Sequence, residues 1–216
     1  MLRFIPAIVH KVGHTGYSTW KSAVTFLHDA IDRTEDILVV VDEDAFIVDW
    51  QGVENLCRYV KENNILYAGM PDGGIIDHRF HSYININPFF AVFNCSLIRP
   101  LKQGTSRELI DETIFDPAME QHKPTWLKTA YEHDTIEPFA GLFYWLASRG
   151  TPLMLKANTM RDGISTVVKG LLDEPLCYHS WYSRQYMSDE ITKKRIDALY
   201  RKAVRDKKQL SEHYML

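Results

Sequence analysis

The sequence predicts an α/β fold in which a mostly parallel mixed sheet is flanked by helices and followed by a C-terminal helical tail. Two observations lead to this class. Short apolar runs rich in β-branched residues alternate with segments of helical periodicity, and one of these runs ends in a group of acids. With 216 residues, 45% of them hydrophobic, the chain can bury one core, so disorder is not expected.

The first part of the chain alternates strands with helices. Residues 4–10 are apolar enough for a short strand. A helix should follow, because four apolar residues recur at the helical period: Trp20, Val24, Leu27 and Ile31. Residues 36–41 form a fully apolar run, typical of a buried parallel strand, with its carboxyl end at Asp42. A second amphipathic helix fits residues 49–62, and another strand follows at 65–69.

The second part of the chain is less regular. Residues 89–98 resume as a long strand, and residues 99–134 are polar and predicted to be rich in loops. The clearest helix has Pro138 at its first helical position and Gly150 where a left-handed C-terminal cap belongs. Residues 153–157 are predicted to form the last short strand.

Charge and cysteine content narrow the function classes. The formal charge of −3 provides no overall field to attract nucleic acid, so no nucleic-acid partner is expected. The cysteines are odd in number and lack the spacing of zinc sites, which favours a reducing compartment with structural thiols: Cys57, Cys95 and Cys177. No apolar run approaches the roughly 20 residues that span a bilayer. We therefore expect a soluble, cytoplasmic protein.

The C-terminal extension, residues 188–216, is predicted to be a basic amphipathic helix. From Asp189 to Lys208 there are eight Lys or Arg residues and four acids. A helix of this kind can make weak contact with a membrane surface or an acidic partner. The alternative is a solvated helix that packs its apolar stripe on the domain.

The most informative segment is the acidic end of the strand at 36–41. Asp42, Glu43 and Asp44 lie where ligands bind in open α/β sheets, and their charges repel one another unless a cation or hydrogen-bond donors are present. Oxygen ligands of this kind suit Mg²⁺ or Mn²⁺. The alternative, that these acids only cap the next turn, would require one acid rather than three.

This strand end resembles the DxD motif of GT-A glycosyltransferases, and the chain as a whole is similar to family-2-like members. The resemblance implies that residues 1–187 form a GT-A-like catalytic domain. It also implies that Asp42 and Asp44 hold Mn²⁺ or Mg²⁺ against the diphosphate of a nucleotide-sugar donor, with Glu43 beside the donor. The reaction implied is transfer of the sugar to a hydroxyl acceptor.

Two further segments resemble the donor and acceptor sides of such a site. Gly13, His14 and Gly16 are similar to the stretch that faces the donor sugar and its phosphates, although a plain turn has the same composition. The run from Asn85 to Asn94 resembles the strand that walls the sugar and acceptor site, which implies that Phe90 and Asn94 contact the acceptor. Phenylalanines there are also typical of a core.

The remaining implied site residues are a base and a histidine. Asp134 and Glu137 resemble the acidic motif that supplies the general base in inverting members, and spacing does not decide between them. Capping of the following helix is the alternative for both. His179, within Tyr178-His179-Ser180-Trp181-Tyr182, matches the position of a further metal ligand, and a structural histidine is the alternative.

The chain also departs from the family. GT-A enzymes carry another βαβ unit before this region, so the sequence indicates a fragment, or a shortened member with a different nucleotide pocket. A truncated, non-catalytic domain that binds metal or sugar is therefore one alternative function. A HAD-type phosphohydrolase with Asp42 as the nucleophile is another, although Phe46 departs from that motif.

Overall fold

The computed structural model describes residues 18–213, without the side chains of residues 18–22, 208 and 210–213. The strand predicted at 4–10 and the donor-side residues Gly13, His14 and Gly16 lie outside the described residues. The chain order is α1 (Ser18–Arg33), β1 (Ile37–Val41), β2 (Ala45–Ile47), α2 (Trp50–Glu62), β3 (Tyr67–Pro71), β4 (Ile86–Asn94), α3 (Cys95–Lys102), α4 (Arg107–Asp111), η1 (Pro117–His122), α5 (Ala140–Ala147), β5 (Pro152–Met154), β6 (Ala157–Thr159), β7 (Thr166–Lys169), β8 (Pro175–His179), η2 (Ser183–Gln185) and α6 (Glu190–His213).

The strands form two four-stranded sheets. The larger has the order β1-β4-β3-β5, and β4 is antiparallel to both β1 and β3, whereas β3 and β5 are parallel. The smaller has the order β2-β8-β7-β6 and is antiparallel throughout. The predicted α/β class is confirmed. The predicted mostly parallel sheet is corrected, because one neighbouring pair is parallel within residues 18–213.

The physical reason lies in the connection between β3 and β4. A parallel neighbour needs a crossover, which is usually helical. Residues 72–85 contain no helix, and the chain returns through this loop to enter the larger sheet between β1 and β3 in the opposite direction. As a result β1, β3 and β5 all run the same way, and their carboxyl ends face the same edge of the sheet.

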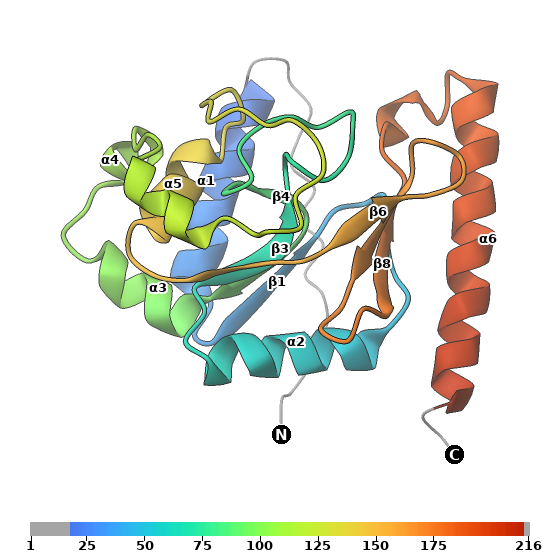
Figure 1. Ribbon diagram of the computed structural model, residues 1–216, viewed down its shortest axis with the longest axis horizontal. Helices are drawn as coiled ribbons and strands as arrows, with labels where there is room; N and C mark the ends of the chain where they lie inside the picture. The colour runs from blue at the N-terminus through green and yellow to red at the C-terminus, as the bar shows by residue number, and fades with distance from the viewer. Residues whose placement is uncertain (1–17, 214–216) are drawn as a thin grey trace.

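Figure 1 shows the helices covering the sheets, and three apolar clusters lie between these layers. On one face of the larger sheet, α1, α3 and α5 bury a cluster that includes Ile31, Phe93 and Phe143. On the other face, α2 and the smaller sheet share a second cluster, and a third fixes α6 to the outer side of the smaller sheet. All three cysteines are free and buried.

Local signals explain where several elements begin and end. Asp49 caps α2 by accepting a hydrogen bond from the Gly52 amide at 2.9 Å, and Asn64, just after the helix, has a positive φ of 54°. The left-handed cap predicted at Gly150 is wrong, because α5 ends at Ala147, its C-cap Ser148 is in the right-handed region, and Gly150 has no positive φ. A side chain at Gly150 would instead meet Leu66 at 2.7 Å, so close packing accounts for this glycine.

Three other element boundaries differ from the sequence prediction. The strand predicted at 89–98 ends at Asn94, after which α3 begins. The helix predicted from Pro138 begins two residues later, at Ala140, whose amide donates to the Glu137 carbonyl at 3.0 Å. Residues 153–157 are not the last strand, because β7 and β8 follow.

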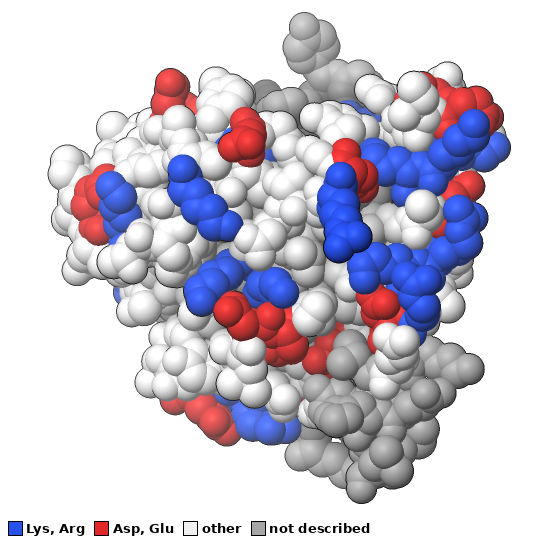
Figure 2. All heavy atoms as spheres, turned by 45° about the vertical axis from the view of Figure 1, so that its right-hand side comes forward, with Lys and Arg blue, Asp and Glu red and all other residues white. Residues whose placement is uncertain are grey.

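The C-terminal helix α6 uses its apolar stripe within the molecule. Ile196, Leu199 and Ala203 are at most 8% exposed. Its opposite side is basic: Figure 2 shows Lys and Arg side chains gathered over this part of the surface. Within residues 18–213 no helix has the length and apolar content needed to cross a membrane. Contact of the basic side with a membrane surface or an acidic partner stays a prediction.

Candidate active site

The candidate site lies at the edge where β1 and β3 end. Asp42 directly follows β1, and Asp72 directly follows β3. Because these strands point the same way and both pair with β4, their carboxyl ends are held on either side of it. This is the edge at which ligands bind in open α/β sheets.

The acidic turn after β1 exposes two acids and buries the third. The Asp42 amide donates to the Phe89 carbonyl at 2.8 Å, and the Asp42 side chain accepts from the Glu43 amide at 2.8 Å. Asp42 and Glu43 are exposed, whereas Asp44 is only 7% exposed. The turn therefore directs one carboxylate into the protein and leaves two at the surface.

Asp44 forms a buried pair with His179. Nε2 of His179 lies 3.0 Å from Oδ1 of Asp44, and Ser180 Oγ donates to the other carboxylate oxygen at 3.3 Å. Burial raises the pKa of Asp44, but the hydrogen bond and charge of His179 outweigh it and hold that pKa below its ordinary value. Asp44 is therefore a carboxylate at neutral pH, so Nε2 is the donor.

His179 retains an unused nitrogen. Its ring stacks on Phe89 at 3.9 Å and lies 4.1 Å from the Trp181 ring, and the residue is 4% exposed. Nδ1 is buried without a hydrogen-bond partner among the described residues. A buried polar atom without a partner costs stability. Carboxylate oxygen with imidazole nitrogen is a donor set that suits Mn²⁺, but Nε2 donates to Asp44 and the free Nδ1 lies on the other side of the ring. Asp44 and His179 would therefore bind one ion only after this hydrogen bond is broken.

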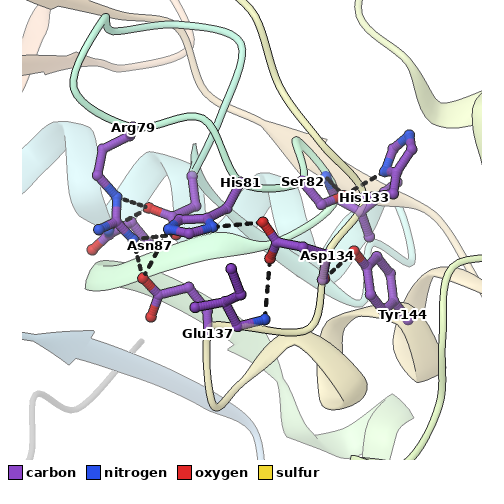
Figure 3. A network of polar contacts seen from close by, with 11 residues as sticks. Arg79, His81, Ser82, Asn87, His133, Asp134, Glu137 and Tyr144 are labelled. Atoms are coloured by element: carbon purple, nitrogen blue, oxygen red, sulfur yellow. Dashed lines mark hydrogen bonds and ion pairs between the residues drawn. The ribbon is translucent and has the colours of Figure 1, made fainter.

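A second polar cluster surrounds Asp72 (Figure 3). Asp72 is 2% exposed and accepts hydrogen bonds from Arg79 Nε at 2.7 Å and Asn87 Nδ2 at 2.6 Å. The other carboxylate oxygen pairs with Arg79 Nη2, which also pairs with Glu137. Burial raises the pKa of Asp72 above its ordinary value, although Arg79 and Asn87 oppose this shift. Arg79 thus joins two carboxylates from different loops.

His81 brings together the two acids predicted as bases. Its Nδ1 lies 2.8 Å from Oδ2 of Asp134, and its Nε2 lies 3.4 Å from Oε1 of Glu137 (Figure 3). Oδ1 of Asp134 accepts from the Ile136 amide at 3.1 Å, and the Asp134 carbonyl accepts from the Tyr144 hydroxyl at 2.7 Å. Both carboxylate oxygens and the backbone carbonyl of Asp134 therefore make polar contacts that hold it in place.

The second cluster raises the question of a metal site there. Among the described residues, one group of three His, Cys, Asp or Glu has all its ligand atoms within 4.8 Å of one another: Asp72, His81 and Glu137. Asp42, Asp44 and His179 do not meet that distance as a trio. However, Arg79 already pairs with the carboxylates of Asp72 and Glu137, so a metal bound to these two acids and His81 would have to displace the guanidinium. We assign this group as an acid–arginine cluster.

A glycine allows the loop to fold over Asp72. A Cβ at Gly73 would lie 1.7 Å from the His81 carbonyl oxygen, and Gly73 forms an isolated bridge with Phe80. The backbones can approach this closely only without a side chain. This contact returns Arg79 and His81 to the end of β3.

Trp181 lies between the two polar clusters. Its ring is 4.1 Å from the His179 ring, and the Arg79 guanidinium lies 5.7 Å from the Trp181 ring centroid. The His78 ring is 5.0 Å away on the same indole. The pair of Asp44 and His179, termed the metal-type pair, and the acid–arginine cluster are therefore neighbours in one site, with the Trp181 side chain between them.

Two predicted acceptor residues are not brought to this site. Asn94 pairs with Ile37 at the start of β1, at the opposite end of the sheet from Asp42. Four residues of strand separate it from Phe90, roughly 13 Å. Phe90 is completely buried in the core cluster shared with α2. The neighbouring Phe89, rather than Phe90, stacks on His179.

The sequence prediction missed Asp72, Arg79, His81 and Asn87. One signal was available: Asp72 follows an apolar run and precedes Gly73, as Asp42 follows the strand before it. The others come from an irregular loop and from β4, and their convergence depends on the direction in which β4 enters the sheet.

Comparison with family models, with curated proteins and with solved structures found no match to this chain. What the site does must therefore be argued from its own residues.

Proposed function

We propose that the protein is a metal-dependent glycosyltransferase, which moves a sugar from a nucleotide-sugar donor to a hydroxyl acceptor. The proposal depends on one observation: two clusters of acidic side chains lie at the same edge of the larger sheet. The buried pair of Asp44 and His179 lies on one side of Trp181, and the Asp134 and Glu137 cluster lies on the other. A nucleotide-sugar donor held by Asp44 and His179 would present its sugar toward Asp134 and Glu137.

Asp44 and His179, with Asp42 from the exposed part of the turn, would hold Mn²⁺ or Mg²⁺. When bound, such an ion supplies positive charge that stabilises the diphosphate as it leaves. The chain's own contribution is to place one carboxylate and one imidazole in a site walled by Phe89 and Trp181, where burial strengthens electrostatic interactions.

Of the two predicted bases, the geometry favours Glu137. Its Oε1 pairs with Arg79 and His81, which fixes the carboxylate, while Oε2 has no hydrogen bond among the described residues. Both carboxylate oxygens of Asp134 are engaged, by His81 and the Ile136 amide. In this scheme Glu137 takes the proton of the acceptor hydroxyl as that oxygen replaces the diphosphate at the anomeric carbon. Asp134 orients His81.

The proposal is tested by incubating the protein with Mn²⁺ and a panel of nucleotide sugars, and then measuring release of nucleoside diphosphate and sugar transfer to an added hydroxyl acceptor. Transfer that requires metal supports the proposal. Release of inorganic phosphate with an acyl-phosphate on Asp42 would instead support the phosphohydrolase alternative. Binding of Mn²⁺ and diphosphate without turnover would support the non-catalytic alternative.

A further inference from the structure

Arg195 connects α6 to the candidate site. Its Nη2 donates to the Trp181 carbonyl at 2.9 Å, and its Nη1 donates to Ser165 Oγ at 3.0 Å and to the Ser180 carbonyl. Two of these three acceptors are consecutive carbonyls, immediately after His179. The planar guanidinium is suited to this task, because its donors have a fixed fork geometry.

The turn that Arg195 holds is strained. Trp181 and Tyr182 have φ values of 58° and 60°, in the left-handed region that residues with a Cβ rarely adopt. Two such residues in succession persist only where surrounding contacts determine the backbone, and strain of this kind clusters at functional sites. The Arg195 hydrogen bonds supply such contacts at the carbonyls of Ser180, just before the turn, and of Trp181 within it.

The conformation of this turn decides where the Trp181 indole lies. Its Nε1 donates to Thr166 Oγ1 at 2.8 Å, and the ring lies against His179 and within 5.7 Å of Arg79. A relaxed backbone at Trp181 would move a side chain that contacts both polar clusters. The C-terminal helix is thereby coupled to the site rather than only packed on the smaller sheet.

We propose that Arg195 is a positioning residue, which holds the left-handed turn at Trp181 and Tyr182 and so sets the aromatic wall between the metal-type pair and the acid–arginine cluster. Its effect on turnover rests on the proposed function. Its effect on Trp181 does not.

The first test reads the position of Trp181 directly. The chain has five tryptophans, so labelling with 5-fluorotryptophan gives one fluorine signal for each, and Trp181→Phe identifies the signal of Trp181. We expect Arg195→Gln to shift or broaden that signal. Arg195→Lys keeps the positive charge but lacks the planar guanidinium donors, and it should shift or broaden the same signal. This second variant provides the test if Arg195→Gln does not fold. The matched control is Arg201→Gln, an exposed arginine of the same helix.

The second test measures transfer. We expect Arg195→Gln to lower turnover roughly tenfold or more, because small misplacements of catalytic groups are costly, while its melting temperature stays close to that of Arg201→Gln. An unmoved Trp181 signal in both Arg195 variants overturns the proposal. A moved signal with unchanged turnover overturns the positioning role. If the wild-type protein transfers no sugar, the proposed function fails and the fluorine result still decides whether Arg195 holds the turn.

Discussion

The two ends of the larger sheet both carry charged clusters, but the clusters differ in balance. At the end near the start of β1, Asp32 pairs with Lys102 and with Arg107, and His28 pairs with Asp111. At the carboxyl ends of β1 and β3, one arginine and two histidines serve four carboxylates; these residues are Arg79, His81, His179, Asp44, Asp72, Asp134 and Glu137.

This difference separates a structural network from a candidate active site. At the first end, three acids of α1 and α4 meet two permanent cations of α3 and α4 and one histidine of α1, so most of the negative charge is offset across the helix contacts; the acids are Asp29, Asp32 and Asp111, and their partners are Lys102, Arg107 and His28. At the other end, negative charge exceeds the permanent positive charge, and carboxylates gathered in this way repel one another. Under the proposed function, a bound metal ion and the proton of the acceptor hydroxyl would offset this excess.

The largest effect is expected at the proposed base. In Glu137→Gln, the amide oxygen can still accept a hydrogen bond from Arg79, but the side chain can no longer act as a base. Turnover should therefore fall by ~10²- to 10⁴-fold while donor affinity is retained. Steady-state kinetics with the identified donor would measure this. Asp111→Asn, in the balanced network, is the control and should leave turnover unchanged. Equal rates for Glu137→Gln and the wild type would reduce Glu137 to a structural partner of Arg79.

The next effect concerns the loop that completes the acid–arginine cluster. Gly73→Ala would place a Cβ 1.7 Å from a backbone oxygen, so the loop bearing Arg79 and His81 must move. We expect a loss of about 3 kcal/mol in the free energy of unfolding, the upper part of the range for overpacking, measured by urea denaturation.

The control for this change is Gly104→Ala. Gly104 has a positive φ of 79°, which Gly73 does not, and a Cβ there would have no neighbour within 4 Å. It should cost only about 1 kcal/mol, the strain of a left-handed residue. Equal losses for the two variants would show that the contact with His81 costs no more than the strain of one left-handed residue.

A smaller effect tests the metal. Asp44→Asn removes the buried carboxylate charge, and we expect Mn²⁺ binding to weaken at least about tenfold, 1.4 kcal/mol, in a calorimetric titration. Asp32→Asn, at the balanced end, should bind as the wild type does. An unchanged titration for Asp44→Asn would remove the metal from the proposed function.

Elements with local signals were predictable, and long-range arrangements were not. The periodicity of α2 and of α6 and the apolar run of β1 are properties of short windows, and all three elements formed where predicted. The strands β7 and β8 were missed because they pair with each other and with β2 in a small antiparallel sheet, and β7 mixes Thr166 and Lys169 with apolar residues.

The same distinction holds within the site. Asp44 and His179 are 135 residues apart, and the pairing of Ala45 with His179 between β2 and β8 brings them together. A family resemblance suggested both residues, but no local pattern contains that pairing. Asn94 was assigned to the site through the same resemblance; because β4 runs opposite to β1, its last residue pairs with Ile37 at the other edge of the sheet from Asp42.

The smallest expected effect belongs to the balanced network and is visible as a pH dependence. Burial raises the pKa of Asp32, but hydrogen bonds and charges from Lys102 and Arg107 outweigh it, so the folded-state pKa is below the usual 3.8. A lowered carboxyl pKa contributes stability that is fully present above the unfolded-state pKa and is lost as pH falls through the folded-state value. Because the Asp32 side chain is 37% exposed, solvent screening limits the contribution to about 1 kcal/mol or less.

Asp32→Asn should therefore be less stable than the wild type at about pH 7 and about pH 5, and the difference should shrink below the unfolded-state pKa as the wild-type carboxylate takes up a proton. Urea unfolding at these pH values and at about pH 3 would measure it. The amide oxygen can still accept from Lys102, which is only 8% exposed at its side chain, but the amide nitrogen cannot accept from Arg107. The lost hydrogen bond acts at every pH, so the part of the difference that varies with pH reports the charge. A difference that is constant across this range would mean that the charge of Asp32 contributes nothing and that the network acts through shape alone.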